Sequence, residues 1–164
     1  MAATRNVAVV LLGLVHLASA VTQTPDLTTC SSSTGVTFSD VTASNVKVGD
    51  TLTLGYTIHI KDKIDGDPEL VFTMTSGSSK MPCLGDVGSC NYDLCGATGK
   101  VEKQIATSWD NKCPIPAGTY TNSVNVKMPL LAGLLIKEDT IHVKMEPESN
   151  GELLGCVEFD LDVE

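Results

Sequence analysis

The stretch TLTLGYTIHI, Thr51–Ile60, alternates apolar and polar side chains over ten residues. Successive side chains of a β-strand point to opposite faces, so the apolar members share one face: Leu52, Leu54, Tyr56, Ile58 and Ile60. Three threonines and His59 lie on the other face. A strand with one apolar and one polar face is typical of an antiparallel sheet that packs on a core and faces water on its outer side.

Five more stretches indicate strands, and turn-rich segments separate them. They are GVTFSDV (35–41), PELVFTMT (68–75), YTNSVNVKM (120–128), TIHVKME (140–146) and ELLGCVEFDLDV (152–163). Their inward residues by phase are Leu70, Phe72, Met74, Tyr120, Val124, Val126, Met128, Ile141, Val143, Met145, Val157, Phe159, Leu161 and Val163. We find no long helical periodicity and expect at most one turn of helix around SCNYDLCGAT. The sequence therefore predicts an all-β antiparallel β-sandwich.

The first twenty residues have the layout of a secretory signal peptide. Arg5 is the one cation, an apolar run extends from Val7 to Leu17, and Ala18-Ser19-Ala20 provides the small residues of a cleavage site. The apolar run is too short to span about 30 Å of hydrocarbon. We therefore expect residues 1–20 to be removed and residues 21–164 to form a single domain.

Charge narrows the range of partners. Removal of residues 1–20 takes away the only arginine, so 10 lysines remain against 20 Asp and Glu, and the net charge is −10. Phosphate recognition needs clustered Lys and Arg, so we expect no nucleic-acid partner. The same balance disfavours strong attraction to anionic bilayers at neutral pH, and protonation of carboxylates at acidic pH would weaken that repulsion.

The predicted domain contains six cysteines: Cys30, Cys83, Cys90, Cys95, Cys113 and Cys156. An even count in an exported chain is typical of a disulfide framework and predicts three disulfides. A zinc site is the alternative, but the chain has no Cys-x-x-Cys pair and few histidines. Six cysteines allow fifteen pairings, and their spacing alone does not choose among them.

Residue groupings typical of enzymes are missing from the sequence. It contains no Gly-x-Ser-x-Gly, no His-Glu-x-x-His and no Gly-rich phosphate loop. His59 and His142 fall on the polar faces of their strands, which predicts solvent-facing histidines, with a pH-sensing role as the alternative. Asp65 and Asp67 indicate a turn, with a calcium site as the minor alternative. We expect no catalytic residue, no metal and no enzyme activity.

The cysteine-containing segments carry a resemblance to a known family. The matching sequence motifs are MPC, VGSC and then Cys95, followed by CPIPAGTY and, at the end, LGCVEFDLDV. In order and approximate spacing they resemble the ganglioside activator branch of the ML (lipid-recognition) superfamily, over nearly the whole chain from Cys30 onward. That superfamily also includes cholesterol-transfer proteins of the Niemann-Pick type and mite allergens.

The resemblance implies a disulfide pairing and a shape. It implies Cys30–Cys156, Cys83–Cys90 and Cys95–Cys113, in an immunoglobulin-like, cup-shaped sandwich whose sheets splay around a cavity for acyl chains. The inward residues that we assign to this lipid cavity are Leu54, Tyr56, Ile58, Leu70, Phe72, Met74, Tyr120, Val124, Val126, Met128, Ile141, Val143 and Phe159. The family usually has one more disulfide between the positions of Cys95 and Cys113. Both of its cysteines are absent here, so we expect the segment 97–111 to be looser or differently shaped.

An apolar loop, MPLLAGLLI (128–136), interrupts this acidic chain. It is too short for a membrane span, and Pro129 and Gly133 disfavour a strand. In the resemblance it falls on an apolar loop at the cavity mouth, which predicts membrane contact through Leu130, Leu131, Leu134, Leu135 and Ile136. The alternative is a loop that folds back onto the core.

Together these features predict a lipid-binding and transfer protein. We expect a phospholipid or glycolipid ligand, transient contact with a membrane surface and no cofactor besides bound lipid. A glycosidase partner is the family's best-known one, and the alternative function is a secreted interaction protein that binds an immune or host receptor. The chain has no Asn-x-Ser/Thr sequon on which lysosomal sorting could act, so we predict extracellular secretion, with the lysosomal lumen as the alternative.

Overall fold

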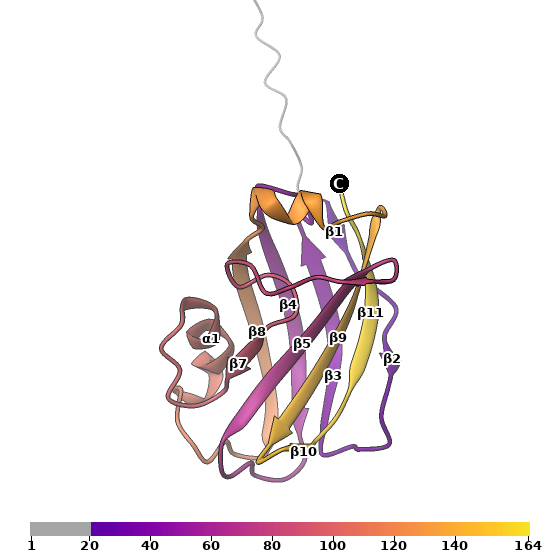
Figure 1. Cartoon of the computed structure of the whole chain (residues 1–164). Coiled ribbons are helices and arrows are strands. Elements are labelled where there is room, and N and C mark those ends of the chain that lie inside the picture. The colour runs from indigo at the N-terminus through magenta and orange to yellow at the C-terminus, as the bar shows by residue number, and fades with distance from the viewer. Residues whose placement is uncertain (1–20) are drawn as a thin grey trace, which may run out of the picture.

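A computed structural model describes residues 21–164 and shows two antiparallel β-sheets packed face to face (Figure 1). This is the predicted immunoglobulin-like sandwich. The proposed signal peptide, residues 1–20, lies outside the described residues. No helix in the described part of the chain is long and apolar enough to cross a membrane.

The first sheet has four strands in the order β1-β3-β4-β8. They are β1 (Thr22–Gln23), β3 (Val36–Ser44), β4 (Thr51–Ile60) and β8 (Gly118–Lys127). The central strand β4 has the bounds that the alternation predicts, and all five of its inward residues are buried. It pairs with β8 over its whole length, from Thr51 opposite Lys127 to Ile60 opposite Gly118.

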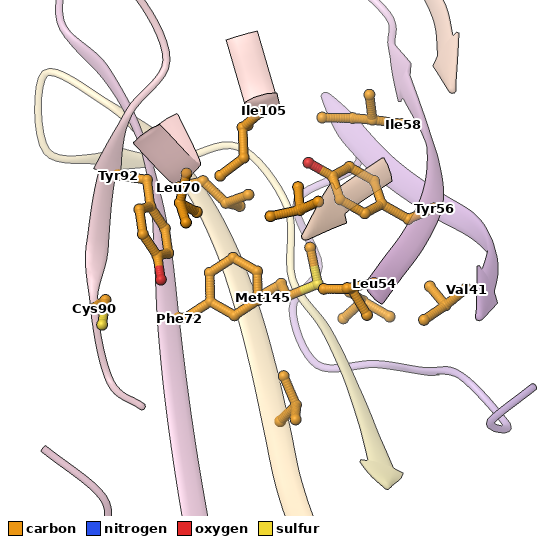
Figure 2. Close-up of a cluster of buried hydrophobic side chains, with 14 of the residues drawn as sticks. Val41, Leu54, Tyr56, Ile58, Leu70, Phe72, Cys90, Tyr92, Ile105 and Met145 are labelled. Carbon is orange, nitrogen blue, oxygen red and sulfur yellow. The ribbon is translucent and has the colours of Figure 1, made fainter. Parts of the chain in front are cut away.

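The second sheet has the order β2-β11-β9-β5-β6, with β10 beside β9 and β7 beside β5. Its strands are β2 (Thr28–Thr29), β5 (Pro68–Ser76), β6 (Ser79–Lys80), β7 (Asn91–Asp93), β9 (Thr140–Ser149), β10 (Glu152–Leu153) and β11 (Val157–Asp162). No hydrogen-bonded ladder joins this sheet to the first, so the layers meet mainly through side chains. These side chains form one apolar cluster, part of which Figure 2 shows.

Two strand boundaries differ from the prediction. The C-terminal stretch is not one strand, because residues 154–156 separate β10 from β11, and the register against β9 shifts by one residue across this gap. There the backbone passes so close to Val36 that a Cβ atom at Gly155 would lie 2.0 Å from the Val36 carbonyl oxygen. The second difference is that β9 continues through Pro147, where the sequence predicted a turn. Proline lacks an N–H, but its carbonyl still accepts a hydrogen bond from Leu154 N, at 2.9 Å.

Of the two alternatives for segment 97–111, looser or differently shaped, the structure does not show the looser one. The segment contains a short helix, α1 (Lys100–Ile105), followed directly by a 3₁₀ turn, η1 (Ala106–Trp109). Val101, Ile105 and Trp109 recur every four residues and are buried, so side-chain packing anchors the segment without a fourth disulfide. A second 3₁₀ turn, η2 (Leu130–Leu134), lies at the opposite end of the sandwich from β10 (Figure 1).

The three disulfides are Cys30–Cys156, Cys83–Cys90 and Cys95–Cys113, as the resemblance implied. Within the described residues no cysteine is free. Cys30–Cys156 holds the N-terminal segment to the start of β11, across a sequence separation of 126 residues. Cys83–Cys90 closes a short loop, across a sequence separation of only 7 residues.

We predict that these two disulfides differ in their contribution to stability. Replacing Cys30 and Cys156 with alanine is expected to lower the free energy of unfolding by about 5 kcal/mol, because this disulfide restricts a long loop in the unfolded chain. The matched Cys83→Ala/Cys90→Ala variant is expected to lose about 2 kcal/mol, since its loop is short. Urea unfolding under non-reducing conditions measures both, and equal losses would contradict the prediction.

Candidate functional site

A small apolar cavity lies between the two sheets, beneath α1 and the disulfide loop 83–90. The space open to the centres of water-sized spheres is about 30 Å³. One ordered water needs roughly 10–15 Å³ by this measure, so the cavity is far smaller than a lipid tail. It is lined by Leu52, Leu54, Phe72, Met74, Asp86, Val87, Tyr92, Val101, Ile105, Val124 and Val126.

The open cup implied by the resemblance is therefore nearly closed. Five of the residues assigned to the lipid cavity do line this space: Leu54, Phe72, Met74, Val124 and Val126. Seven others are buried in the packed core around it: Tyr56, Ile58, Leu70, Met128, Ile141, Val143 and Phe159. Tyr120 is half-buried and packs edge-to-face on Trp109, at 5.6 Å between ring centroids. The inward side chains fill the space between the sheets and leave little of it empty.

Sequence reasoning missed several lining residues. Val101 and Ile105 come from α1, and their four-residue spacing before Trp109 was the available signal for an amphipathic turn. Tyr92 comes from the three-residue strand β7, and Asp86 comes from the disulfide loop. These two residues show no periodicity, so nothing in the local sequence places them at the cavity.

The α1 segment is fastened to the edge of β8 by polar contacts. Gln104 Nε2 donates to the Asn125 carbonyl oxygen at 3.1 Å, and Asn125 N donates to Gln104 Oε1 at 2.8 Å. Deeper in the sandwich, Asn122 Nδ2 donates to the Ile105 carbonyl oxygen at 3.2 Å, and Ser108 Oγ donates to Asn122 Oδ1. Asn122 is therefore stable on the inward face of β8, because its amide is hydrogen-bonded and holds the helix that covers the cavity.

Tyr92 is the polar aromatic residue of the cavity wall. Its ring packs edge-to-face on Phe72, and its hydroxyl donates to the Asp86 carbonyl oxygen at 2.8 Å. Burial raises the pKa of Tyr92 well above its ordinary value, and the carboxylates of Asp86 and Glu102 raise the pKa further. The phenol is therefore neutral at physiological pH and acts here as a structural donor.

At the η2 end of the sandwich, three leucines point into solvent. Leu130, Leu131 and Leu134 are 77 %, 64 % and 78 % exposed, and we call them the leucine patch. Among the described residues Val21, at 53 %, is the only other exposed large apolar side chain, and it is less exposed than any of the three leucines. Exposed apolar side chains gathered on one turn are typical of an interaction surface.

The rest of the apolar loop 128–136 packs on the core. Met128 and Ala132 are buried, and Leu135 and Ile136 are half-buried against the apolar cluster. Gly133 lies against the loop between β3 and β4, where a Cβ atom would be 3.3 Å from Val48 Cγ1. The structure thus combines the two readings of the loop, with one face folded back and the other outward.

The cavity and the leucine patch lie toward the same end. On the β4–β8 pair, Leu52 opposite Val126 is nearest η2, and Leu54 opposite Val124 is one layer deeper. The disulfide loop also reaches η2, since a Cβ atom at Gly85 would lie 3.5 Å from Pro129 Cγ. An apolar path from the patch into the sandwich is therefore short.

The two histidines lie on outer strand faces, as predicted, but are hydrogen-bonded. His59 shares hydrogen bonds with the hydroxyls of Ser39, at 2.9 Å, and Thr119, at 3.0 Å. His142 Nδ1 lies 2.8 Å from Asp160 Oδ1 on the neighbouring strand. Among residues 21–164 no group of His, Cys, Asp and Glu is arranged to hold a metal ion.

A family profile, described as the ML domain, matches residues 25–163. The chain belongs to the ML domain family. This is a lipid-binding family, as the resemblance implied.

Solved structures support the fold. A Niemann-Pick type C2 protein from the Japanese carpenter ant superposes with a TM-score of 0.54 at 14 % identity, over 85 % of this chain and 99 % of that one. At this identity the likeness concerns the fold alone. A comparison with curated protein sequences finds no match.

We predict that the leucine patch contributes almost nothing to the stability of the free protein. Leu131→Ser/Leu134→Ser is expected to change the free energy of unfolding by less than about 0.5 kcal/mol, because both side chains are exposed. The control Met128→Ala, in the buried part of the same loop, is expected to cost about 2–5 kcal/mol. Urea unfolding tests this, and a large loss in the double serine variant would show that the leucines pack on the fold.

Proposed function

We propose that this ML-domain chain is a secreted lipid-binding and transfer protein. It takes the acyl chains of a phospholipid or glycolipid between its two sheets and leaves the head group at the η2 end. The observation that carries the proposal is the apolar cavity between the sheets, a short distance from an exposed leucine patch. Removing acyl chains from water supplies most of the affinity.

Uptake of a lipid requires the sandwich to widen. Pockets for drug-sized ligands hold roughly 300–1,000 Å³, far more than the space present here. Because no hydrogen-bonded ladder joins the two sheets, they can move apart without breaking strand pairing. The lining is mainly aliphatic, with Met74 as an adaptable member, so it can repack around chains of different length.

Membrane contact is assigned to the leucine patch. Burying about half of its three side chains in a bilayer interface contributes roughly 2–4 kcal/mol in total. That is enough for reversible contact and too little for permanent insertion, as a shuttle requires. Leu135 and Ile136, predicted from the sequence to join this contact, are half-buried and would contribute after the loop shifts.

Charged residues beside the patch carry both signs. Lys127 and Lys137 bracket the apolar loop 128–136 and are exposed. Glu138 and Asp139 follow Lys137, and Asp50 lies on the neighbouring loop between β3 and β4. Lys137 is partly held by Ser79, with Nζ 3.0 Å from Oγ. With opposite charges interspersed, apolar burial and not charge is the main source of attraction to the membrane.

The three disulfides suit an oxidising compartment, in keeping with secretion or, as the alternative, a lysosomal lumen. A glycosidase or a receptor is then a partner that would meet the loaded protein at the η2 end. We assign no cofactor besides bound lipid, no enzyme activity and no nucleic-acid partner.

A second candidate is an interaction protein whose leucine patch binds a receptor. The same exposed side chains favour it, since protein interfaces also use apolar patches. The two functions separate by experiment. One stoichiometric protein partner, captured equally by lipid-free and lipid-loaded protein, would favour the receptor-binding function.

Lipid mass spectrometry tests the main proposal. The chain from residue 21 is expressed with its disulfides intact, extracted with organic solvent, and the extract is analysed for lipid. We expect a co-purifying lipid and uptake of fluorescent phospholipid or glycolipid from vesicles. A protein that is consistently lipid-free and takes up neither probe overturns the proposal.

We predict that Leu131→Asp/Leu134→Asp reduces extraction of lipid from liposomes by at least about tenfold, because burying carboxylates in the bilayer interface is unfavourable. The matched control Thr28→Asp/Ala117→Asp adds the same charge at exposed positions away from η2 and is expected to extract normally. Both variants should keep the wild-type circular dichroism spectrum. Equal extraction by all three proteins would exclude membrane contact through the leucine patch.

A further inference from the structure

One buried polar group in the sandwich has no partner. Tyr56 is only 2 % exposed, and its hydroxyl is the single buried side-chain N or O atom among residues 21–164 without a hydrogen bond. Its ring reaches from β4 into the space between the sheets (Figure 2). Native proteins rarely leave such a group unpaired, so its presence needs a reason.

The other buried aromatic donors are all satisfied. Tyr92 donates to the Asp86 carbonyl oxygen, and Trp109 Nε1 donates to the Leu94 carbonyl oxygen at 2.6 Å. If position 56 required only volume, phenylalanine would fill it without burying an unpaired hydroxyl. The hydroxyl of Tyr56 is therefore the exception in an interior that otherwise pairs its polar atoms.

The nearest polar neighbour does not supply the missing bond. Asn122 stands directly opposite Tyr56 on β8, and its amide donates to Ile105 and accepts from Ser108, but no atom of Asn122 is within hydrogen-bond geometry of the Tyr56 hydroxyl. Burial raises the pKa of Tyr56 far above its ordinary value, and the amide of Asn122, near the phenol but outside hydrogen-bond geometry, offsets part of that rise. The neutral Tyr56 hydroxyl is therefore free to donate and to accept.

Tyr56 lies one layer below the cavity. The cavity is lined by two successive pairs of β4 and β8, Leu52 with Val126 and Leu54 with Val124, and the next pair is Tyr56 with Asn122. Two residues along a strand span about 7 Å, so a modest deepening of the cavity reaches this layer. Figure 2 places the hydroxyl on the side of Ile105, which lines the cavity.

We propose that Tyr56 is the buried hydrogen-bonding partner of the ligand, so that the preferred lipid carries an oxygen, a hydroxyl or a carbonyl, within its buried apolar part. The inference rests on the proposed lipid binding and refines it. A plain hydrocarbon tail at this depth leaves the Tyr56 hydroxyl unpaired. A tail with one oxygen at the right distance satisfies both groups out of water, where the bond discriminates most strongly.

A matched ligand series tests this. Octadecanoic acids with a single hydroxyl at carbon 7, 9, 10, 12 or 17 are compared with plain octadecanoic acid by displacement of a fluorescent fatty acid. Cholesterol and its 3-deoxy analogue form a second pair that tests a sterol as the source of the oxygen. We expect at least one oxygenated member to bind about 5- to 10-fold more tightly than its plain counterpart, the effect of one buried hydrogen bond.

The Tyr56→Phe variant decides whether the tyrosine causes the preference. It is expected to bind the plain ligand at least as well as the wild type and to lose the preference for the oxygenated one. Failure of every ligand to bind the wild-type chain would count against the proposed lipid binding itself. Binding without any oxygen preference, or a preference that persists in Tyr56→Phe, would leave lipid binding intact and overturn this inference.

Stability of the lipid-free protein gives a second, independent readout. Tyr56→Phe removes an unpaired hydroxyl and is expected to raise the melting temperature. The matched control Tyr92→Phe removes a paired hydroxyl, leaves the Asp86 carbonyl without its donor and is expected to lower it. A fall in the melting temperature of Tyr56→Phe, similar to that of Tyr92→Phe, would mean that Tyr56 is already bonded inside the free protein and would overturn the proposal.

Discussion

The structure depends on one constraint, that each sheet has an apolar face which only the other sheet can cover. The alternation in β4 sets this requirement, and β5, β8, β9 and β11 repeat it. Backbone hydrogen bonds are satisfied within each sheet, so the two layers are held together by side-chain contacts and by few other links. Cys30–Cys156 lies within the second sheet, where it joins the end of β2 to the start of β11, and does not bridge the two layers. The apolar faces that stabilise the fold also make the space between the sheets apolar.

Inward packing of side chains explains why the interior is nearly closed. A sandwich that kept a lipid-sized void would lose the contacts of every lining side chain. Here α1 and the disulfide loop bring Ile105, Val101 and Val87 down onto the gap between β5 and β8. The closed form and an occupied form would then differ by repacking of aliphatic side chains and not by refolding. Such a difference is small enough for a ligand to reverse.

Features of the fold that repeat along the sequence could be predicted from it, and features that do not repeat could not. The strands β4, β5, β8 and β9 followed from alternation, because a strand in a two-layer sandwich must alternate wherever it occurs. The disulfide pairing needed the family resemblance, since pairing depends on distances in the fold. The short α1 escaped prediction because Val101, Ile105 and Trp109 give only two helical repeats, which is a weak signal. The continuation of β9 through Pro147 escaped it because tertiary pairing outweighed the local preference of proline. Tyr56 was correctly placed on the inward face, but the missing partner of its hydroxyl is a property of the packed interior alone.

The attachment of Gln104 to Asn125 has a consequence for assembly. The strand β8 forms the outer edge of its sheet, and an uncovered edge offers its N–H and C=O groups to any passing strand. By occupying both backbone groups of Asn125, the Gln104 side chain imitates a neighbouring strand and ends the sheet at that point. The Gln104 side chain therefore hinders strand addition at this point of the β8 edge. At this position the free edge of the sheet is closed to a second copy of the chain by a side chain of the same molecule.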